Sequence, residues 1–78
     1  MEIIDAFAQV LLRLRKERGL THEKLAERAG LHPTTLSLLE HGKRQPSLTT
    51  IFLLADGLGV EPNELVREVK KLRPKLRK

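Results

Sequence analysis

The sequence predicts an all-α fold, a compact domain of five short helices, and three observations support this prediction. Apolar residues recur every three or four positions in successive segments, which is the spacing of one helix face. Glycine or proline stands near the segment boundaries, where helices end and begin. The chain of 78 residues has no cysteine, so packed helices or a second copy of the chain must stabilise it in place of disulfides or a cysteine-based zinc site.

The first helix is expected to run from about Ile3 to Arg18. Phe7, Leu11 and Leu14 fall at positions i, i+4 and i+7 and form its core stripe. Gly19 then suits the left-handed conformation in which many helices end.

Two further helices are expected on either side of Gly30. The first begins after Thr21, a good N-cap, and ends near Ala29. The second, about 33–41, begins at Pro33, where the missing N–H is harmless. Two apolar stripes joined by a short turn that contains glycine describe a helix-turn-helix, whose second helix turns an uncovered face outward and is able to enter a DNA major groove.

The fourth and fifth helices are predicted in the same way. The fourth begins after the N-cap Ser47 and ends near Leu58, and its broad apolar face should lie in the core. That face consists of Leu48, Ile51, Phe52, Leu54, Ala55 and Leu58, with Leu53 on the opposite side. The fifth begins at Pro62, and its stripe consists of Leu65, Val66, Val69 and Leu72. We expect one domain over residues 1–72 and a basic tail at 73–78.

The net charge of +5 is concentrated at one end of the chain. Residues 1–69 contain nine basic and ten acidic side chains, whereas residues 70–78 contain six basic side chains and no acidic one. The tail is therefore expected either to contact flanking phosphates or simply to aid solubility. No apolar run approaches the roughly 20 residues that span a membrane, and no secretory signal is recognisable, so we expect a soluble cytoplasmic protein without a membrane partner.

The run from about Ala6 to Val66 resembles the Xre/Cro-type helix-turn-helix DNA-binding domains of phage repressors and restriction–modification controller proteins. The resemblance rests on a set of spaced signals along this run. They include Leu14-Arg15, Gly19-Leu20-Thr21, Leu25-Ala26, Gly30-Leu31, Leu36-Ser37, Leu39-Glu40, Gly42-Lys43, Pro46-Ser47-Leu48, Leu58-Gly59-Val60 and Glu64-Leu65. It implies a repressor-like five-helix fold that binds operator DNA, usually as a dimer.

The resemblance implies that residues at and after the start of the third helix contact base edges. In this sequence they are His32, Pro33, Thr34, Ser37 and Leu38. Thr34 is able to hydrogen-bond a base, whereas Leu38 is able only to pack on a thymine methyl or exclude a base. Since this face has no Arg, Gln or Asn, we expect modest direct readout, with phosphate contacts and DNA shape contributing more.

Phosphate contacts are expected at two helix starts and in the loop after the third helix. Helix N-termini present free N–H groups to phosphate oxygens. The candidate residues are Thr21, His22, Thr35, His41, Lys43, Arg44 and Ser47. The alternative for Lys43 and Arg44 is an ordinary solvated loop.

Two structural roles are also implied. The resemblance places Arg15 and Glu40 as a partly buried ion pair between the first and third helices. Apolar residues without an obvious core role are expected at a homodimer interface through the fourth and fifth helices. These are Leu53, Val66 and Val69, with Leu12 as a further candidate.

Catalytic and metal-binding functions are not expected. The three histidines lack HxxxH spacing, and the sequence has neither cysteine nor a glycine-rich nucleotide loop, so no cofactor or small-molecule ligand is implied. The sequence predicts a homodimeric transcriptional regulator that binds double-stranded DNA at a pseudo-palindromic operator. The alternative is a protein-interaction module or antitoxin component on the same fold. The sequence does not choose among a controller protein, a phage-type repressor and an antitoxin. It also leaves open whether binding represses or activates transcription.

Overall fold

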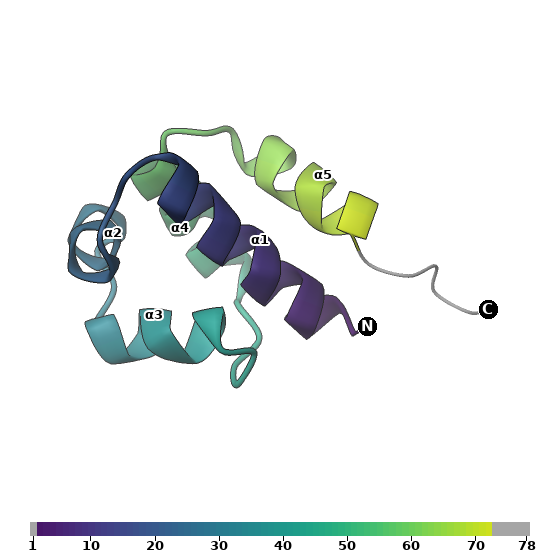
Figure 1. Ribbon diagram of the computed structural model, residues 1–78, viewed down its shortest axis with the longest axis horizontal. Helices are drawn as coiled ribbons and strands as arrows, with labels where there is room; N and C mark the ends of the chain where they lie inside the picture. The colour runs from purple at the N-terminus through teal and green to yellow at the C-terminus, as the bar shows by residue number, and fades with distance from the viewer. Residues whose placement is uncertain (1, 73–78) are drawn as a thin grey trace.

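The computed structural model describes residues 2–72, which form five α-helices joined by short loops and contain no strand (Figure 1). The helices are α1 (Ile3–Glu17), α2 (His22–Ala29), α3 (Pro33–Glu40), α4 (Leu48–Leu58) and α5 (Pro62–Leu72). The all-α, five-helix prediction is confirmed, with helix ends close to the predicted ones. The predicted basic tail at 73–78 lies outside the described residues.

The helices pack around one apolar core. α1 crosses the molecule and contacts both α3 and α5, while α2 packs against α3 and α4, and α4 packs against α5 (Figure 1). The largest side chains fully buried in this core are Val10, Leu11, Leu25, Leu36, Leu39, Leu54 and Leu65. None of the helices within residues 2–72 is both long and apolar enough to cross a membrane.

The turn between α2 and α3 is built by local hydrogen bonds. The Thr21 hydroxyl accepts the Lys24 N–H at 3.0 Å and caps the start of α2. Gly30 ends this helix with φ of +71°, a left-handed conformation that glycine adopts at little energetic cost because it has no Cβ. The Leu31 N–H then returns to the Ala26 carbonyl at 2.9 Å, so the chain leaves α2 in a fixed direction and enters α3.

α4 lies very close to α2 because residue 57 is glycine. Gly57 is buried, and a Cβ built on it would lie 3.2 Å from the backbone nitrogen of Ala29 and 3.1 Å from Leu25 Cδ1. A backbone atom at this distance cannot rotate away as a flexible side chain would. The glycine in the last turn of α4 therefore favours the close packing of α2 against α4, a role that its low helix propensity alone does not reveal.

The side of α4 that faces the core differs from the prediction. Leu48 and Phe52 were expected in the core, but they are 70% and 51% exposed. Leu53 was expected to lack a core role, yet it is half-buried and packs against the core. On α5, Val69 was likewise expected to lack a core role, but it is only 8% exposed and belongs to the core, whereas Val66 is exposed. α4 is rotated so that Leu54, Ala55 and Leu58 face inward.

Exposed charges join α1 to α5. Arg13 Nη2 donates to Glu68 Oε1 at 2.6 Å, and Lys71 Nζ lies 3.2 Å from Glu68 Oε2. The hydrogen bond from Arg13, and then that from Lys71, holds the pKa of the Glu68 carboxyl below its ordinary value. The Arg13–Glu68 contact connects α1 to α5, and the Lys71–Glu68 contact lies within α5.

Candidate nucleic-acid interface

α3 is anchored by one face and presents the other to solvent. Leu36 and Leu39 are buried in the core, which fixes the rotation of the helix. The residues predicted to read bases lie on the remaining surface: His32, Pro33 and Thr34 are exposed, and Ser37 and Leu38 are half-buried. The structure therefore brings these five residues together at one end and along one side of α3.

The His32 side chain caps α3. Its Nδ1 accepts the Thr34 N–H at 3.0 Å, in the manner of the Ser, Thr, Asn or Asp oxygens that usually cap helices. His32 was predicted as a base-reading residue, and capping of α3 by its imidazole was not predicted. The signal available was the position itself, since the residue before an N1 proline is the N-cap.

The other end of α3 carries a second ordered histidine. His41 Nδ1 lies 2.7 Å from the Ser37 carbonyl oxygen and 3.4 Å from the Ser37 hydroxyl. The imidazole therefore folds back along the last turn of the helix, although the residue as a whole is exposed.

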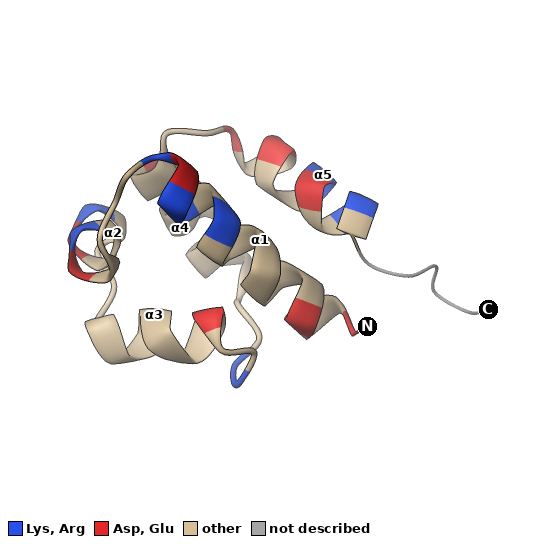
Figure 2. Ribbon diagram, viewed as in Figure 1, with Lys and Arg blue, Asp and Glu red and all other residues tan. Residues whose placement is uncertain are grey.

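The residues predicted to contact phosphates lie at the starts of α2 and α4, on α3 and in the segment after α3. Thr21 and Ser47, exposed at the starts of α2 and α4, each use a hydroxyl to cap their own helix; Ser47 Oγ accepts the Thr50 N–H at 3.1 Å. His22 and Thr35 are half-buried, which leaves less of their surface for a ligand. Lys43 and Arg44 are exposed in the loop between α3 and α4, which is the basic segment just beyond the end of α3 in Figure 2.

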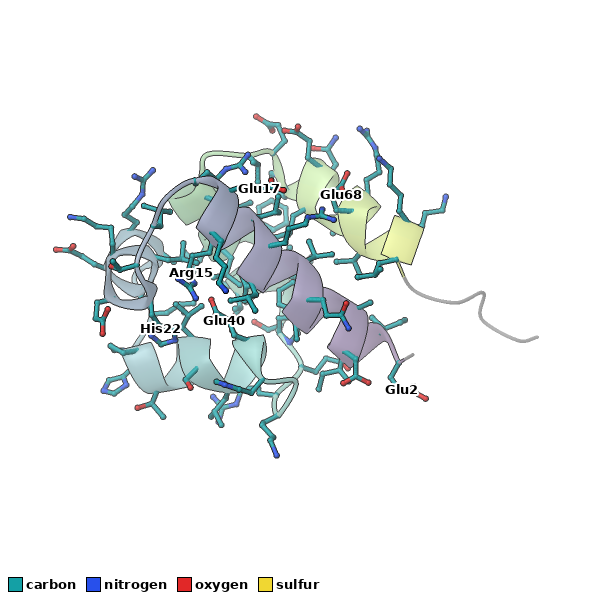
Figure 3. The ribbon with its side chains drawn as sticks, viewed as in Figure 1. Glu2, Arg15, Glu17, His22, Glu40 and Glu68 are labelled. Carbon is teal, nitrogen blue, oxygen red and sulfur yellow. The ribbon has the colours of Figure 1, made fainter. Side chains whose placement is uncertain are left out.

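Arg15 and Glu40 form an ion pair between α1 and α3. Arg15 Nε donates to Glu40 Oε2 at 2.7 Å and Nη2 donates to Oε1 at 3.3 Å, so the guanidinium holds both carboxylate oxygens. Figure 3 shows the two side chains pointing toward each other across the gap between the helices. Their side chains are only 14% and 5% exposed, and Arg15 Nη1 also donates to the Leu20 carbonyl at 2.9 Å. This pair ties the last residue of α3 to the scaffold.

An apolar groove of about 170 Å³ lies elsewhere on the surface. Its lining comes from α1, the α3–α4 loop, α4 and α5, and consists of Ile3, Ile4, Phe7, Gln45, Pro46, Ile51, Val66 and Val69. Exposed Leu48 and Phe52 lie on the same helix as Ile51, four residues apart on its outer side. Within residues 2–72, no three His, Cys, Asp or Glu side chains are grouped so that they could hold a metal ion.

Comparison with known proteins identifies the family. A family model described as Helix-turn-helix matches residues 11–65, from the middle of α1 into α5. An HTH-type transcriptional regulator of Sinorhizobium fredii is 48% identical over 54 residues, which are 69% of this chain and 70% of that protein.

Two solved structures share the fold. The restriction-modification controller protein C.AhdI from Aeromonas hydrophila is 40% identical with a TM-score of 0.77, over 80% of this chain and 94% of that chain. C.Esp1396I bound to a 19 base pair DNA duplex is 25% identical with a TM-score of 0.83, over 91% of this chain and 95% of that one. The resemblance and the repressor-like fold expected from the sequence are thus confirmed, and the chain belongs to the Xre-type helix-turn-helix family of DNA-binding transcription regulators.

Proposed function

We propose that this chain binds double-stranded DNA as a homodimer, at a pseudo-palindromic operator, and regulates transcription from it. The observation that carries the proposal is the exposed side of α3, which is held by the Arg15–Glu40 ion pair and lies between two helix starts and a basic loop. A neighbour with the same fold has been solved on a DNA duplex, which supports the same mode of binding here.

In this proposal α3 enters the major groove. His32, Thr34 and Ser37 supply hydrogen-bonding groups there, and Leu38 packs on a thymine methyl. The free backbone N–H groups at the starts of α2 and α4, together with Lys43 and Arg44, hold phosphates on either side. Because α3 has no Arg, Gln or Asn, much of the sequence preference comes from DNA shape rather than from bidentate base contacts.

The homodimer in this proposal forms through α4 and α5. Large apolar side chains gathered on a surface usually mark an interface. Leu48, Phe52 and Val66 are large, exposed apolar side chains on these two helices, and Val66 lines the apolar groove. Of the residues first predicted for the interface, Val66 keeps that role in the proposal, whereas Val69 belongs to the core and Leu53 packs against it. A two-fold axis through this surface sets the two copies of α3 about one DNA turn, ~34 Å, apart.

Selection of random duplex DNA by the purified chain at about 0.15 M salt tests DNA recognition. We expect enrichment of a two-fold symmetric site with half-sites about one helical turn apart. On that site, Lys43→Ala combined with Arg44→Ala should reduce the log–log salt slope by about two units, since each lost phosphate contact removes about one. Arg67→Ala, an exposed cation on α5, is the matched control and should leave the slope unchanged.

Weak, salt-sensitive binding without any enriched sequence would contradict operator recognition. That outcome would favour an interaction module on the same fold, because the chain would then recognise charge and no sequence.

Sedimentation velocity tests the homodimer separately. Phe52→Glu should convert the dimer to a monomer, because it places a carboxylate in the apolar interface. Phe52→Leu, the matched control, keeps the surface apolar and should remain dimeric. Since Phe52 is half exposed, both variants should keep the wild-type helical circular-dichroism spectrum. An unaltered chain that sediments as a monomer at tens of micromolar, or a dimeric Phe52→Glu variant, would overturn this interface.

A further inference from the structure

The two histidines at the ends of α3 each form a hydrogen bond through Nδ1, but the partner of His32 is a donor and the partner of His41 is an acceptor. His32 Nδ1 faces the Thr34 N–H at 3.0 Å, and an N–H only donates. His32 Nδ1 must therefore carry the lone pair, and the single proton of the neutral ring lies on Nε2. His41 Nδ1 faces the Ser37 carbonyl at 2.7 Å, and a carbonyl only accepts. His41 Nδ1 must therefore carry the proton, which leaves the lone pair of the neutral ring on Nε2.

We propose that α3 presents opposite and fixed hydrogen-bonding polarity at its two ends, and that His32 is the donor that selects an acceptor on DNA. This inference rests on the proposed function and adds the chemistry of one contact to it. Both residues are exposed, so their outward Nε2 atoms are available to a ligand. The helix then offers an N–H at its start and a lone pair at its end.

The donor at His32 discriminates among base edges. In the major groove guanine presents two acceptors, O6 and N7, thymine presents O4, adenine presents N7 beside a donor, and cytosine presents only the N4 donor. An N–H at the start of α3 therefore favours guanine most and cytosine least. A phosphate oxygen is an acceptor of the same chemistry, and the experiment below separates the two.

Nitrogen-15 spectra of the histidine rings, recorded on the chain without DNA, test the tautomers directly. The spectra are recorded as a pH series and compared on the high-pH plateau, where the ring nitrogen shifts no longer change with pH. We expect His32 protonated at Nε2 and His41 protonated at Nδ1 in one sample, each serving as the reference for the other. The same tautomer at both, or averaged signals at His32, would overturn the proposal whether or not the chain binds DNA.

Matched variants test the selection of an acceptor. Both His32→Asn and His32→Asp retain a side-chain oxygen that caps α3, but only asparagine keeps an N–H donor. In selections from random DNA, His32→Asn should retain the preference for guanine over cytosine at one position of each half-site. His32→Asp should lose that preference by about 3- to 10-fold, the value of one hydrogen bond, or reverse it, since a carboxylate accepts from cytosine N4.

Thermal melts of both variants near the wild-type value would show that the cap survives. If His32→Asp weakens binding equally for every sequence, repulsion between the new carboxylate and the phosphates accounts for the loss, and selection of a base acceptor by His32 is overturned. A wild-type base preference and affinity in His32→Asp would overturn the donor role of His32. Absence of any enriched site for the unaltered chain would count against operator recognition itself, while the tautomer measurement would still be decided.

Discussion

Replacing Glu40 with alanine should lower the thermal midpoint by about 12–24 °C. Breaking a buried ion pair by removing one partner costs about 3–5 kcal/mol, because the other charge is left without compensation. Here Arg15 is 14% exposed and keeps its hydrogen bond to the Leu20 carbonyl, so we expect the lower end, about 3 kcal/mol. In a domain of this size, 1 kcal/mol corresponds to a shift of about 4–8 °C.

Circular-dichroism melts at one chain concentration would measure this shift, because dimerisation makes the midpoint depend on concentration. Glu17→Gln is the control, since the Glu17–Arg13 pair is long, at 3.7 Å, and half exposed. Its loss should cost no more than about 1 kcal/mol. Arg15→Met combined with Glu40→Leu should recover most of the stability, because apolar residues of similar volume often replace a buried pair without loss. Superimposable melts for Glu40→Ala and the wild type would refute the reasoning.

Three further substitutions test the scaffold. In urea unfolding, Gly57→Ala should destabilise the chain by about 1–3 kcal/mol despite alanine's better helix propensity, because the new Cβ meets the Ala29 backbone nitrogen. Asp56→Ala, an exposed control in the same helix, should be nearly neutral. A Gly57→Ala variant more stable than the wild type would contradict the close packing. Ser47→Ala should cost about 1 kcal/mol through the lost cap of α4, whereas Ser47→Asp should keep most of it. Glu68→Gln should be less stable than the wild type at neutral pH, and the difference should shrink as pH falls through the lowered pKa of Glu68; an equal difference at pH 3 and pH 7 would contradict this.

The sign of the Glu68 effect follows from the direction of its shift. An acid whose pKa is lower in the folded state contributes its full stabilisation above the unfolded pKa, about 4.3 for glutamate. That contribution disappears as the pH drops below the unfolded value and through the folded one. Glutamine at the same position does not titrate, so only the wild type changes.

Helix positions were predictable because local signals specify them. Thr21 and Ser47 accept the backbone N–H groups that a helix start leaves free, and Gly30 adopts the left-handed conformation that ends α2. Each of these effects depends on a few neighbouring residues. The Arg15–Glu40 ion pair joins residues far apart in the chain, and only the family resemblance indicated it.

The rotation of α4 was not predictable in the same way. This helix has apolar residues on nearly every side, so periodicity leaves open which side faces the core. Packing against α2 and α5 decides it, and Phe52 is turned outward while Leu53 is turned toward the core. The capping role of His32 also escaped prediction, because it depends on a side-chain conformation that brings Nδ1 to the Thr34 N–H.

The missing side chain at Gly57 has a consequence for how the protein fits a duplex. α2 and α4 begin at the two helix starts proposed to hold phosphates, and near their other ends Gly57 packs closely against Ala29, where an added Cβ would meet the Ala29 backbone nitrogen. The size of residue 57 therefore affects how α2 and α4 are spaced, and with them the two helix starts, although residue 57 itself contacts no phosphate in the proposed complex. We expect relatives with a bulkier residue there to grip phosphates at a different spacing along the strand, so this buried position, far from any base, would contribute to which DNA shapes the protein accepts.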